Sequence, residues 1–156
     1  MPIKTFLKNW WPSLLWLSLI AIESTSALSS ENTGGFLYPV FHFLTGVSFE
    51  HFEIWHAYMR KGGHFVGFFV LSWLLFRSWR ATLPAIDLRA WTFQWATIAC
   101  LMAALVASLD EWHQTYLPTR GGSLRDVALD SSAAVTAQIL IWLFLRRRPV
   151  FRVRSA

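Results

Sequence analysis

Three short stretches of the sequence gather side chains that can carry charge or move protons, and each adjoins an apolar run. The first is Arg60-Lys61-Gly62-Gly63-His64-Phe65, the second is Asp110-Glu111-Trp112-His113-Gln114, and the third runs from Pro118 to Asp126. Lys and Arg side chains suit a phosphate or carboxylate group, whereas imidazole and carboxylate groups suit proton transfer. The expected chemistry is recognition of an anionic group, or acid–base catalysis, beside an apolar surface.

In the first stretch, Lys61 and His64 are three residues apart, so a helix would present both on one face. We expect the pair at the outer start of a membrane-spanning helix, with Lys61 binding an anion and His64 acting as base or nucleophile. For Arg60 we favour a structural role, in which the side chain extends to reach lipid head groups.

In the second stretch, Asp110, His113 and Gln114 have the i, i+3, i+4 spacing that places them on one helical face. A carboxylate beside an imidazole orients it and raises its pKa, which is the usual arrangement behind a general base. Asp110, Glu111 and His113 are therefore candidate catalytic residues. The alternative is a polar helix end that is stabilised by its own hydrogen bonds.

The third stretch predicts a tight turn followed by a helix, because Pro118 precedes a Gly pair. Ser123 and Asp126 have the spacing of a capping box, which is a purely structural explanation for both. Asp130, one turn later, is expected to point into a helix bundle. The candidate ligand-binding residues of the three stretches are Lys61, Gln114, Arg120, Arg125 and Asp126.

A metal site is a further alternative for His64, His113, Asp110 and Glu111. No compact HxxH or HExxH spacing supports it, so we predict neither a metal nor another cofactor. The net charge of +5 and the pI of about 10.0 raise the question of nucleic acid. We do not predict it, since Lys and Arg sit at the ends of apolar runs and form no basic groove.

The composition predicts that these stretches belong to a membrane protein. Hydrophobic residues make up 54% of the chain and charged residues 15%, which leaves too little polar surface to cover a soluble core. Four segments approach the length of a spanning helix. We predict an all-α bundle in a single domain, 1–156, with spans at about 11–29, 62–79, 91–109 and 127–145. Glu23 and Asp130 then fall within spans, where an ionisable group is costly.

The positive charges predict the orientation, since Lys and Arg favour the cytoplasmic side. With four crossings, ten of the fourteen lie on one side, so both termini and the middle connection are predicted to be cytoplasmic. The ten are Lys4, Lys8, Arg77, Arg80, Arg89, Arg146, Arg147, Arg148, Arg152 and Arg154. The three stretches then meet at the outer face. As an alternative, the first segment resembles a signal peptide that ends at Ser24-Thr25-Ser26-Ala27.

The predicted outer connection, about 30–60, is long and rich in aromatic residues. Such a segment is typical of one or two amphipathic or half-inserted helices at the outer interface. A plain structural cap over the bundle explains it equally well.

The three stretches together resemble the signature of the VanZ-like family over roughly 60–137. The resemblance rests on Arg60-Lys61-Gly62-Gly63-His64-Phe65, on Asp110-Glu111-x-x-Gln114, and on Pro118, Arg120, Ser123 and Asp126. It implies a small bacterial integral membrane protein, and the founding member of the family is associated with teicoplanin resistance. Departures from the family pattern occur at Gly67, Thr119, Asp130, Ala133 and Ala134, and none removes a charged residue of the signature.

Three hypotheses for function follow. In the first, the chain recognises an anionic envelope lipid or lipid-linked cell-wall precursor at the outer leaflet and contributes to glycopeptide resistance. In the second, it is a hydrolase or transferase that acts on a phosphate- or ester-linked lipid head group. In the third, it is a structural or accessory subunit, and the polar residues only tie helix ends together.

Overall fold

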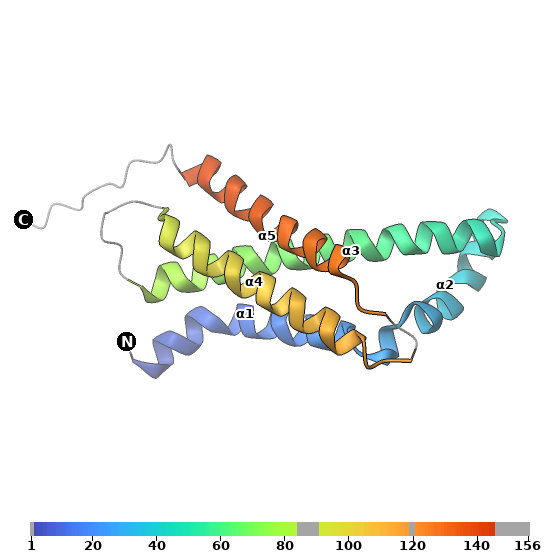
Figure 1. Cartoon of the computed structure of the whole chain (residues 1–156), viewed down its shortest axis with the longest axis horizontal. Helices are drawn as coiled ribbons and strands as arrows, with labels where there is room; N and C mark the ends of the chain where they lie inside the picture. Colours follow the sequence, from blue (N-terminus) through green and yellow to red (C-terminus); the bar gives the residue numbers. More distant parts are fainter. Residues whose placement is uncertain (1, 84–90, 119–120, 146–156) are drawn as a thin grey trace, which may run out of the picture.

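Four long helices lie side by side in the computed structural model, which describes residues 2–83, 91–118 and 121–145 (Figure 1). They are α1 (Ile3–Glu23), α3 (Phe49–Thr82), α4 (Phe93–Gln114) and α5 (Leu124–Leu145). A short 3-10 turn, η1 (Ser26–Leu28), and α2 (Ser30–Thr45) connect α1 to α3. No strand occurs in the described parts of the chain, so the predicted all-α class is confirmed.

α3 is the central helix of the bundle, because it packs against α1, α4 and α5. Polar contacts at three levels fix α1 to it. They join Trp10 Nε1 to Thr82 Oγ1 at 2.8 Å, Ser13 Oγ to Ser78 Oγ at 2.9 Å, and Trp16 Nε1 to the Gly67 carbonyl at 2.8 Å. In the bilayer, where water is absent, such hydrogen bonds help to hold helices together.

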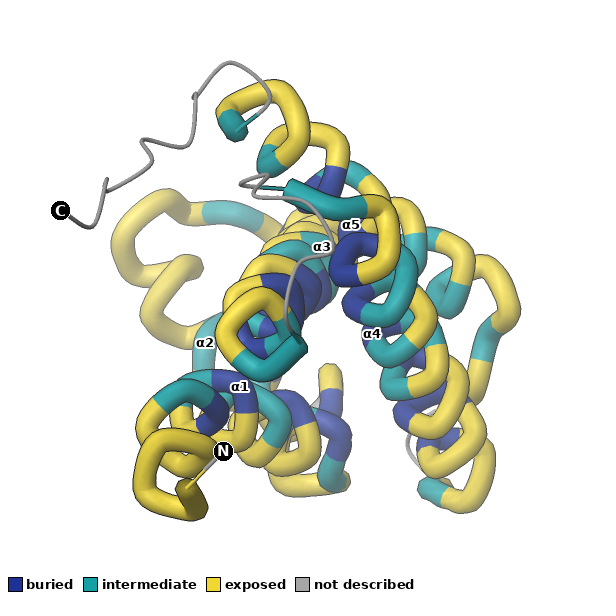
Figure 2. The backbone as a smooth tube through the Cα atoms, turned by 90° about the vertical axis from the view of Figure 1, so that its left-hand side faces the viewer, coloured by how far each residue is buried: buried dark blue, intermediate teal, exposed yellow. Residues whose placement is uncertain are grey.

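α4 packs against its neighbours through Trp95 and a series of alanines, and several of its other large apolar residues face outward. Ala99, Ala103 and Ala107 are fully buried, whereas Leu101 and Leu105 are 66% and 58% exposed. On α5, alanines are buried in the same way. Figure 2 shows buried residues where the helices face one another and exposed residues on their outer sides. Small residues inside and large apolar residues outside are typical of helices packed in lipid.

Two described helices, α4 and α5, are long and apolar enough to cross a membrane. The count rises to three if α1 and the sharply bent segment after it are taken as one span. The chain is therefore a helical membrane protein, and the prediction of four spans remains a prediction. The apolar part of α3, residues 65–76, is bounded by His64 and Arg77, which makes that helix less apolar overall.

The helices that overlap the first two predicted spans extend beyond them. α1 begins at Ile3 and ends at Glu23, so Glu23 closes a helix and does not lie inside one. α3 begins at Phe49, so Lys61 and His64 lie near its middle and not at its start. The cause is that hydropathy reports the apolar stretch, whereas the hydrogen-bonded helix continues through polar residues. The other two predicted spans, 91–109 and 127–145, overlap α4 and α5.

The segment predicted as an external connection is itself helical. Ser29 Oγ accepts a hydrogen bond from Asn32 N and starts α2, and Gly46 ends α2 with a φ of 69°, which favours glycine. The chain then reverses into α3. We call α2 together with residues 49–60 of α3 the outer arm. The arm extends beyond one end of the bundle in Figure 1, and its place on a membrane surface remains a prediction.

Candidate functional site

A cavity of about 650 Å³ lies where the outer arm meets the ends of α4 and α5. One part of its lining is ionic or polar, and the rest is apolar or aromatic. The charged and polar members include Glu53, His56, Arg60, Lys61, His64, Glu111, Gln114 and Asp126. The apolar members include Phe49, Phe52, Ala57 and Leu129. Its volume falls in the range of small-molecule sites.

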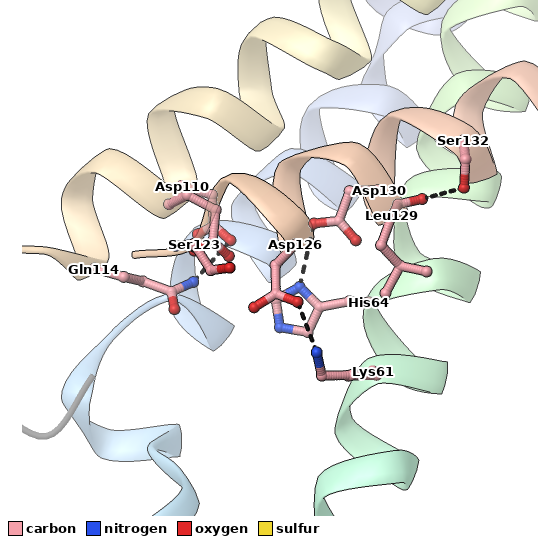
Figure 3. A network of polar contacts seen from close by, with 10 residues as sticks. Lys61, His64, Asp110, Gln114, Ser123, Asp126, Leu129, Asp130 and Ser132 are labelled. Carbon is pink, nitrogen blue, oxygen red and sulfur yellow. Dashed lines mark hydrogen bonds and ion pairs between the residues drawn. The ribbon is translucent and has the colours of Figure 1, made fainter. Parts of the chain in front are cut away.

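An ion pair joins the two helices that border the cavity. Lys61 Nζ on α3 lies 2.9 Å from Asp126 Oδ1 on the first turn of α5. The side chains are 58% and 31% exposed, so the pair faces solvent and is open to exchange with a ligand. Figure 3 shows the pair beside the ring of His64, with Lys61 extending from α3 toward Asp126 on α5. The first and third stretches of the sequence therefore meet directly.

Glu111 performs the capping role that the sequence suggested for Asp126. Glu111 Oε2 accepts a hydrogen bond from Ser123 N at 2.7 Å, just before the first turn of α5. Ser123 Oγ in turn accepts from Arg125 N at 3.2 Å. The predicted capping box is therefore wrong in its second partner, because Asp126 is engaged by Lys61. A carboxylate at a helix N-terminus is favourable because the backbone N–H groups there are unpaired.

Asp130 confirms the prediction that it points into the bundle, since its side chain is fully buried. Its Oδ2 lies 3.5 Å from His64 Nδ1, which is an ion-pair distance, and neither of its oxygens accepts a hydrogen bond from a described residue. Glu23 and Asp110 also interact electrostatically with His64. His64 thus stands between the cavity, which it lines, and a set of carboxylates from α1, α4 and α5.

The predicted pairing of Asp110 with His113 was wrong. Gln114 Nε2 donates to Asp110 Oδ2 at 3.0 Å, and both side chains are buried. His113 is exposed, and its Nδ1 lies 3.1 Å from Ser24 Oγ at the end of α1. The Asp110 carboxylate is therefore bound by the side-chain amide of Gln114, four residues later on α4. The His113 imidazole contacts the end of α1 instead. Gln114 lines the cavity, whereas Asp110 and His113 do not.

The outer wall of the cavity is formed where α2 docks on α3. The ring of His56 stacks on Phe52 with centroids 5.4 Å apart, and its Nε2 lies 3.2 Å from Thr33 Oγ1. Burial lowers the pKa of His56, the charge of Arg60 lowers it further, and Glu53 opposes the shift. His56 is therefore neutral near pH 7 and forms part of an aromatic wall.

Two of the predicted binding residues, Arg125 and Arg120, are not among the described residues that line the cavity. Arg125 is exposed on the first turn of α5 and does not line the cavity. Arg120 lies outside the described residues. No group of three His, Cys, Asp or Glu side chains within 2–83, 91–118 and 121–145 is arranged to hold a metal ion.

Sequence reasoning predicted His64 but missed the cavity residues that precede it on α3, which belong to the outer arm. Glu53, His56, Arg60 and His64 follow one another at intervals of three or four residues, which puts them on one face of a continuous helix. All four line the cavity. The periodicity was a usable signal, but the predicted span began at about 62, so the same helical face was not followed back toward Glu53. Arg60, expected to reach lipid head groups, lines the cavity and donates to the Leu28 carbonyl at 3.4 Å.

This arrangement can hold an amphiphile, since charged groups and an aromatic wall share one cavity. Its described lining has three carboxylates, Glu53, Glu111 and Asp126, and two fixed cations, Arg60 and Lys61. Proton transfer is also within reach at His64, which a buried carboxylate can orient. The ionic groups come from α3, α4 and α5, so the site depends on the assembled bundle.

The sequence model of the VanZ/LLP1 family matches residues 10–145. The match extends well beyond the 60–137 region where the resemblance was noted, and it includes the first helix. Searches of curated proteins and of solved structures found no match. Because the family match covers most of the chain and includes every described residue of the cavity, this protein belongs to the VanZ/LLP1 family.

Proposed function

We propose that this protein binds an envelope lipid, or a lipid-linked cell-wall precursor, through an anionic head group at the outer leaflet. The observation that carries the proposal is the single cavity that joins an ionic region to an aromatic one. Lys61 and Arg60 supply positive charge for the head group. Phe49 and Phe52 supply apolar surface for the first part of the chain. A soluble anion has no apolar chain that could be buried against the aromatic wall.

The proposed setting is the bacterial inner membrane, crossed four times, with both termini in the cytoplasm. The start of α1, the end of α3, the start of α4 and the end of α5 lie at one end of the bundle (Figure 1). Arg77 and Arg80 are on α3 near that end, which supports a cytoplasmic location for it. The cavity lies toward the opposite end and so faces the outer leaflet.

The proposed contribution to glycopeptide resistance follows from competition. A lipid-anchored glycopeptide such as teicoplanin reaches its target at the outer leaflet. A protein that holds the head group of a precursor there would reduce the access of the drug to it. The family resemblance supports this role, and the cavity supplies a place where binding can occur.

The test is a complementation series scored for teicoplanin susceptibility and for the amount of protein in the membrane. His64→Ala and Gln114→Ala are expected to abolish function while the amount of protein is kept, since both residues line the cavity. Arg120→Ala and Glu111→Gln extend the series to the turn before α5. His113→Ala is the matched control, because His113 is on the same helix but outside the cavity. If function falls only in step with the amount of protein, the polar residues are structural and the accessory-subunit hypothesis replaces this one.

A second candidate function, hydrolysis of the head-group linkage, is favoured by the position of His64 between the cavity and Asp130. His64 would accept a proton from water as the water oxygen attacks phosphorus or an ester carbonyl. The bond to the leaving alcohol oxygen would break, and that oxygen would take the proton from His64. A His64→Ala variant that still binds lipid but no longer supports function would favour hydrolysis over binding alone. Release of a head group from lipid by purified protein would establish it.

A further inference from the structure

The ion pair between Lys61 and Asp126 restricts which head groups the cavity can accept. Both residues line the cavity, and their charged atoms are 2.9 Å apart. A purely anionic ligand that binds Lys61 would separate this pair and leave Asp126 without its cation. A purely cationic ligand would leave Lys61 without its carboxylate. A ligand that carries both charges a few atoms apart can bind both partners at once, which gives two charge-assisted interactions where a singly charged ligand gives one.

The surrounding charges favour the same type of ligand. The described lining has more carboxylates than fixed cations, and the carboxylates of Glu23 and Asp110 also interact electrostatically with His64. A bare anion would enter a region where the carboxylates repel it. An ammonium group on the same ligand offsets that repulsion, because it can lie near Glu111 or Asp126.

The ammonium group also suits the other surfaces of the cavity. A primary ammonium has three N–H donors, and the carboxylate oxygens of Glu53, Glu111 and Asp126 are acceptors. Phe49, Phe52 and the neutral ring of His56 form an aromatic wall that can attract a cation through its faces. A quaternary ammonium gains the aromatic contact but cannot donate hydrogen bonds.

We propose that the ligand of this cavity is a zwitterionic lipid head group, a phosphate with a primary ammonium, that exchanges ion pairs with Lys61 and Asp126. The phosphate binds Lys61 and Arg60, and the ammonium binds Asp126 with help from Glu111. This inference rests on the proposed function, keeps its anionic phosphate, and adds an ammonium group to the same head group. The aromatic wall commits it to a membrane lipid and not to a free phosphate ester.

The test measures binding of three lipids to the purified full-length protein by native mass spectrometry in detergent. Phosphatidylethanolamine carries both charges with a primary ammonium, phosphatidylcholine carries a quaternary ammonium, and phosphatidylglycerol is only anionic. We expect phosphatidylethanolamine to bind about tenfold more tightly than either of the others, the difference of one charge-assisted interaction. Glycerophosphoethanolamine, which lacks acyl chains, is expected to compete weakly.

Two variants give opposite signs, which a loss of folding cannot imitate. Asp126→Asn removes the partner of the ammonium and frees Lys61, so phosphatidylethanolamine should bind more weakly and phosphatidylglycerol more tightly. Lys61→Gln should weaken the binding of both lipids, because both carry a phosphate. Glu50→Gln and Lys8→Gln are the matched controls, since both residues are exposed and neither lines the cavity.

The outcomes separate this inference from the proposed function. Equal binding of phosphatidylethanolamine and phosphatidylcholine would show that the ammonium is not recognised through its N–H groups. Preference for phosphatidylglycerol with dependence on Lys61 would overturn the inference but keep an anionic-lipid function. No binding of any lipid, in a protein whose cavity variants still confer resistance, would overturn both.

Discussion

At the scale of single residues, the turn before α5 depends on the absence of a side chain at Gly122. A Cβ there would collide with the backbone carbonyl of Glu111 and with the Thr115 side chain. The close approach lets the Ser123 N–H reach the Glu111 carboxylate. Gly122, in the turn that the sequence predicted, is therefore required for the close approach of that turn to the end of α4.

Gly122→Ala is expected to lower the free energy of unfolding by about 1–3 kcal/mol, since backbone atoms must move to admit the methyl group. Gly121→Ala is the matched control, because a Cβ at Gly121 meets nothing within 4 Å. Thermal unfolding in detergent measures both. Equal melting temperatures for the two variants would contradict the close approach.

Glu111→Ala is expected to destabilise the protein by about 1 kcal/mol, because the partly buried Ser123 N–H loses its acceptor. Glu111→Gln keeps an acceptor oxygen and should lose much less. The comparison of melting temperatures therefore separates the hydrogen bond from the charge. If Glu111→Gln and Glu111→Ala lowered the melting temperature equally, the negative charge at the start of α5, and not the hydrogen bond, would be the stabilising interaction.

At the scale of elements, the docking of α2 on α3 depends on a neutral His56. Its pKa in the docked arm lies below the ordinary value of 6.5. Between the two values the detached state binds more protons, so docking strengthens as the pH rises through that interval. Docking is fully favourable above 6.5 and weakens as the pH falls toward the lowered value.

Hydrogen exchange of α2 is therefore expected to increase as the pH is lowered from about 8 to about 5, after correction for the intrinsic rate. His56→Gln removes the titrating group and should remove the dependence. Exchange in η1 and α1 serves as the internal control. An unchanged profile in the variant would assign the effect to another group.

The α4–α5 contact depends on small side chains. Ala103 is fully buried, whereas Ser108 on the same helix is exposed. Ala103→Leu is expected to lower stability by about 1–3 kcal/mol through overpacking, and Ser108→Leu should be tolerated. Membrane abundance and thermal unfolding measure the difference. Tolerance of both would mean that the helices separate more easily than their packing suggests.

The sequence predicted the contacts of these elements better than their ends. Lys61, Glu111 and Asp126 were expected at one level, and the structure brings them together, because helix periodicity fixes a face once the helix is known. The start of α3 was not predictable from hydropathy, because hydropathy identifies the apolar segment that can enter a membrane and does not identify where the helix begins. Glu111, and not Asp126, accepts the hydrogen bond from Ser123 N. Which of the two does so depends on how far α4 is shifted along its axis relative to α5, and no local sequence pattern encodes that shift.

At the scale of the whole molecule, α3 is longer than a membrane is thick. Its 34 residues extend about 51 Å at 1.5 Å per residue, against a hydrocarbon core of about 30 Å. Part of the helix must therefore lie outside the core. The exposed aromatic residues of the outer arm are at the end that protrudes beyond the bundle (Figure 1).

The proposed topology predicts where a membrane-impermeant maleimide reacts. In a Cys100→Ala background, Ser48→Cys at the tip of the outer arm should react in intact spheroplasts. Ala81→Cys near the other end of α3 should react only after permeabilisation, because that end is assigned to the cytoplasm. Both positions are exposed. Reaction of both in intact spheroplasts would contradict the passage of α3 through the membrane.

The unbroken course of α3 has a mechanical consequence. Lys61 and His64 lie close to its midpoint, and the outer arm and the bundle lie on either side of them. A rod that tilts to match a thinner or thicker bilayer moves least at its pivot and most at its ends. A change in bilayer thickness would therefore shift the outer arm more than Lys61 and His64, and the position of these two residues relative to α5 would change least.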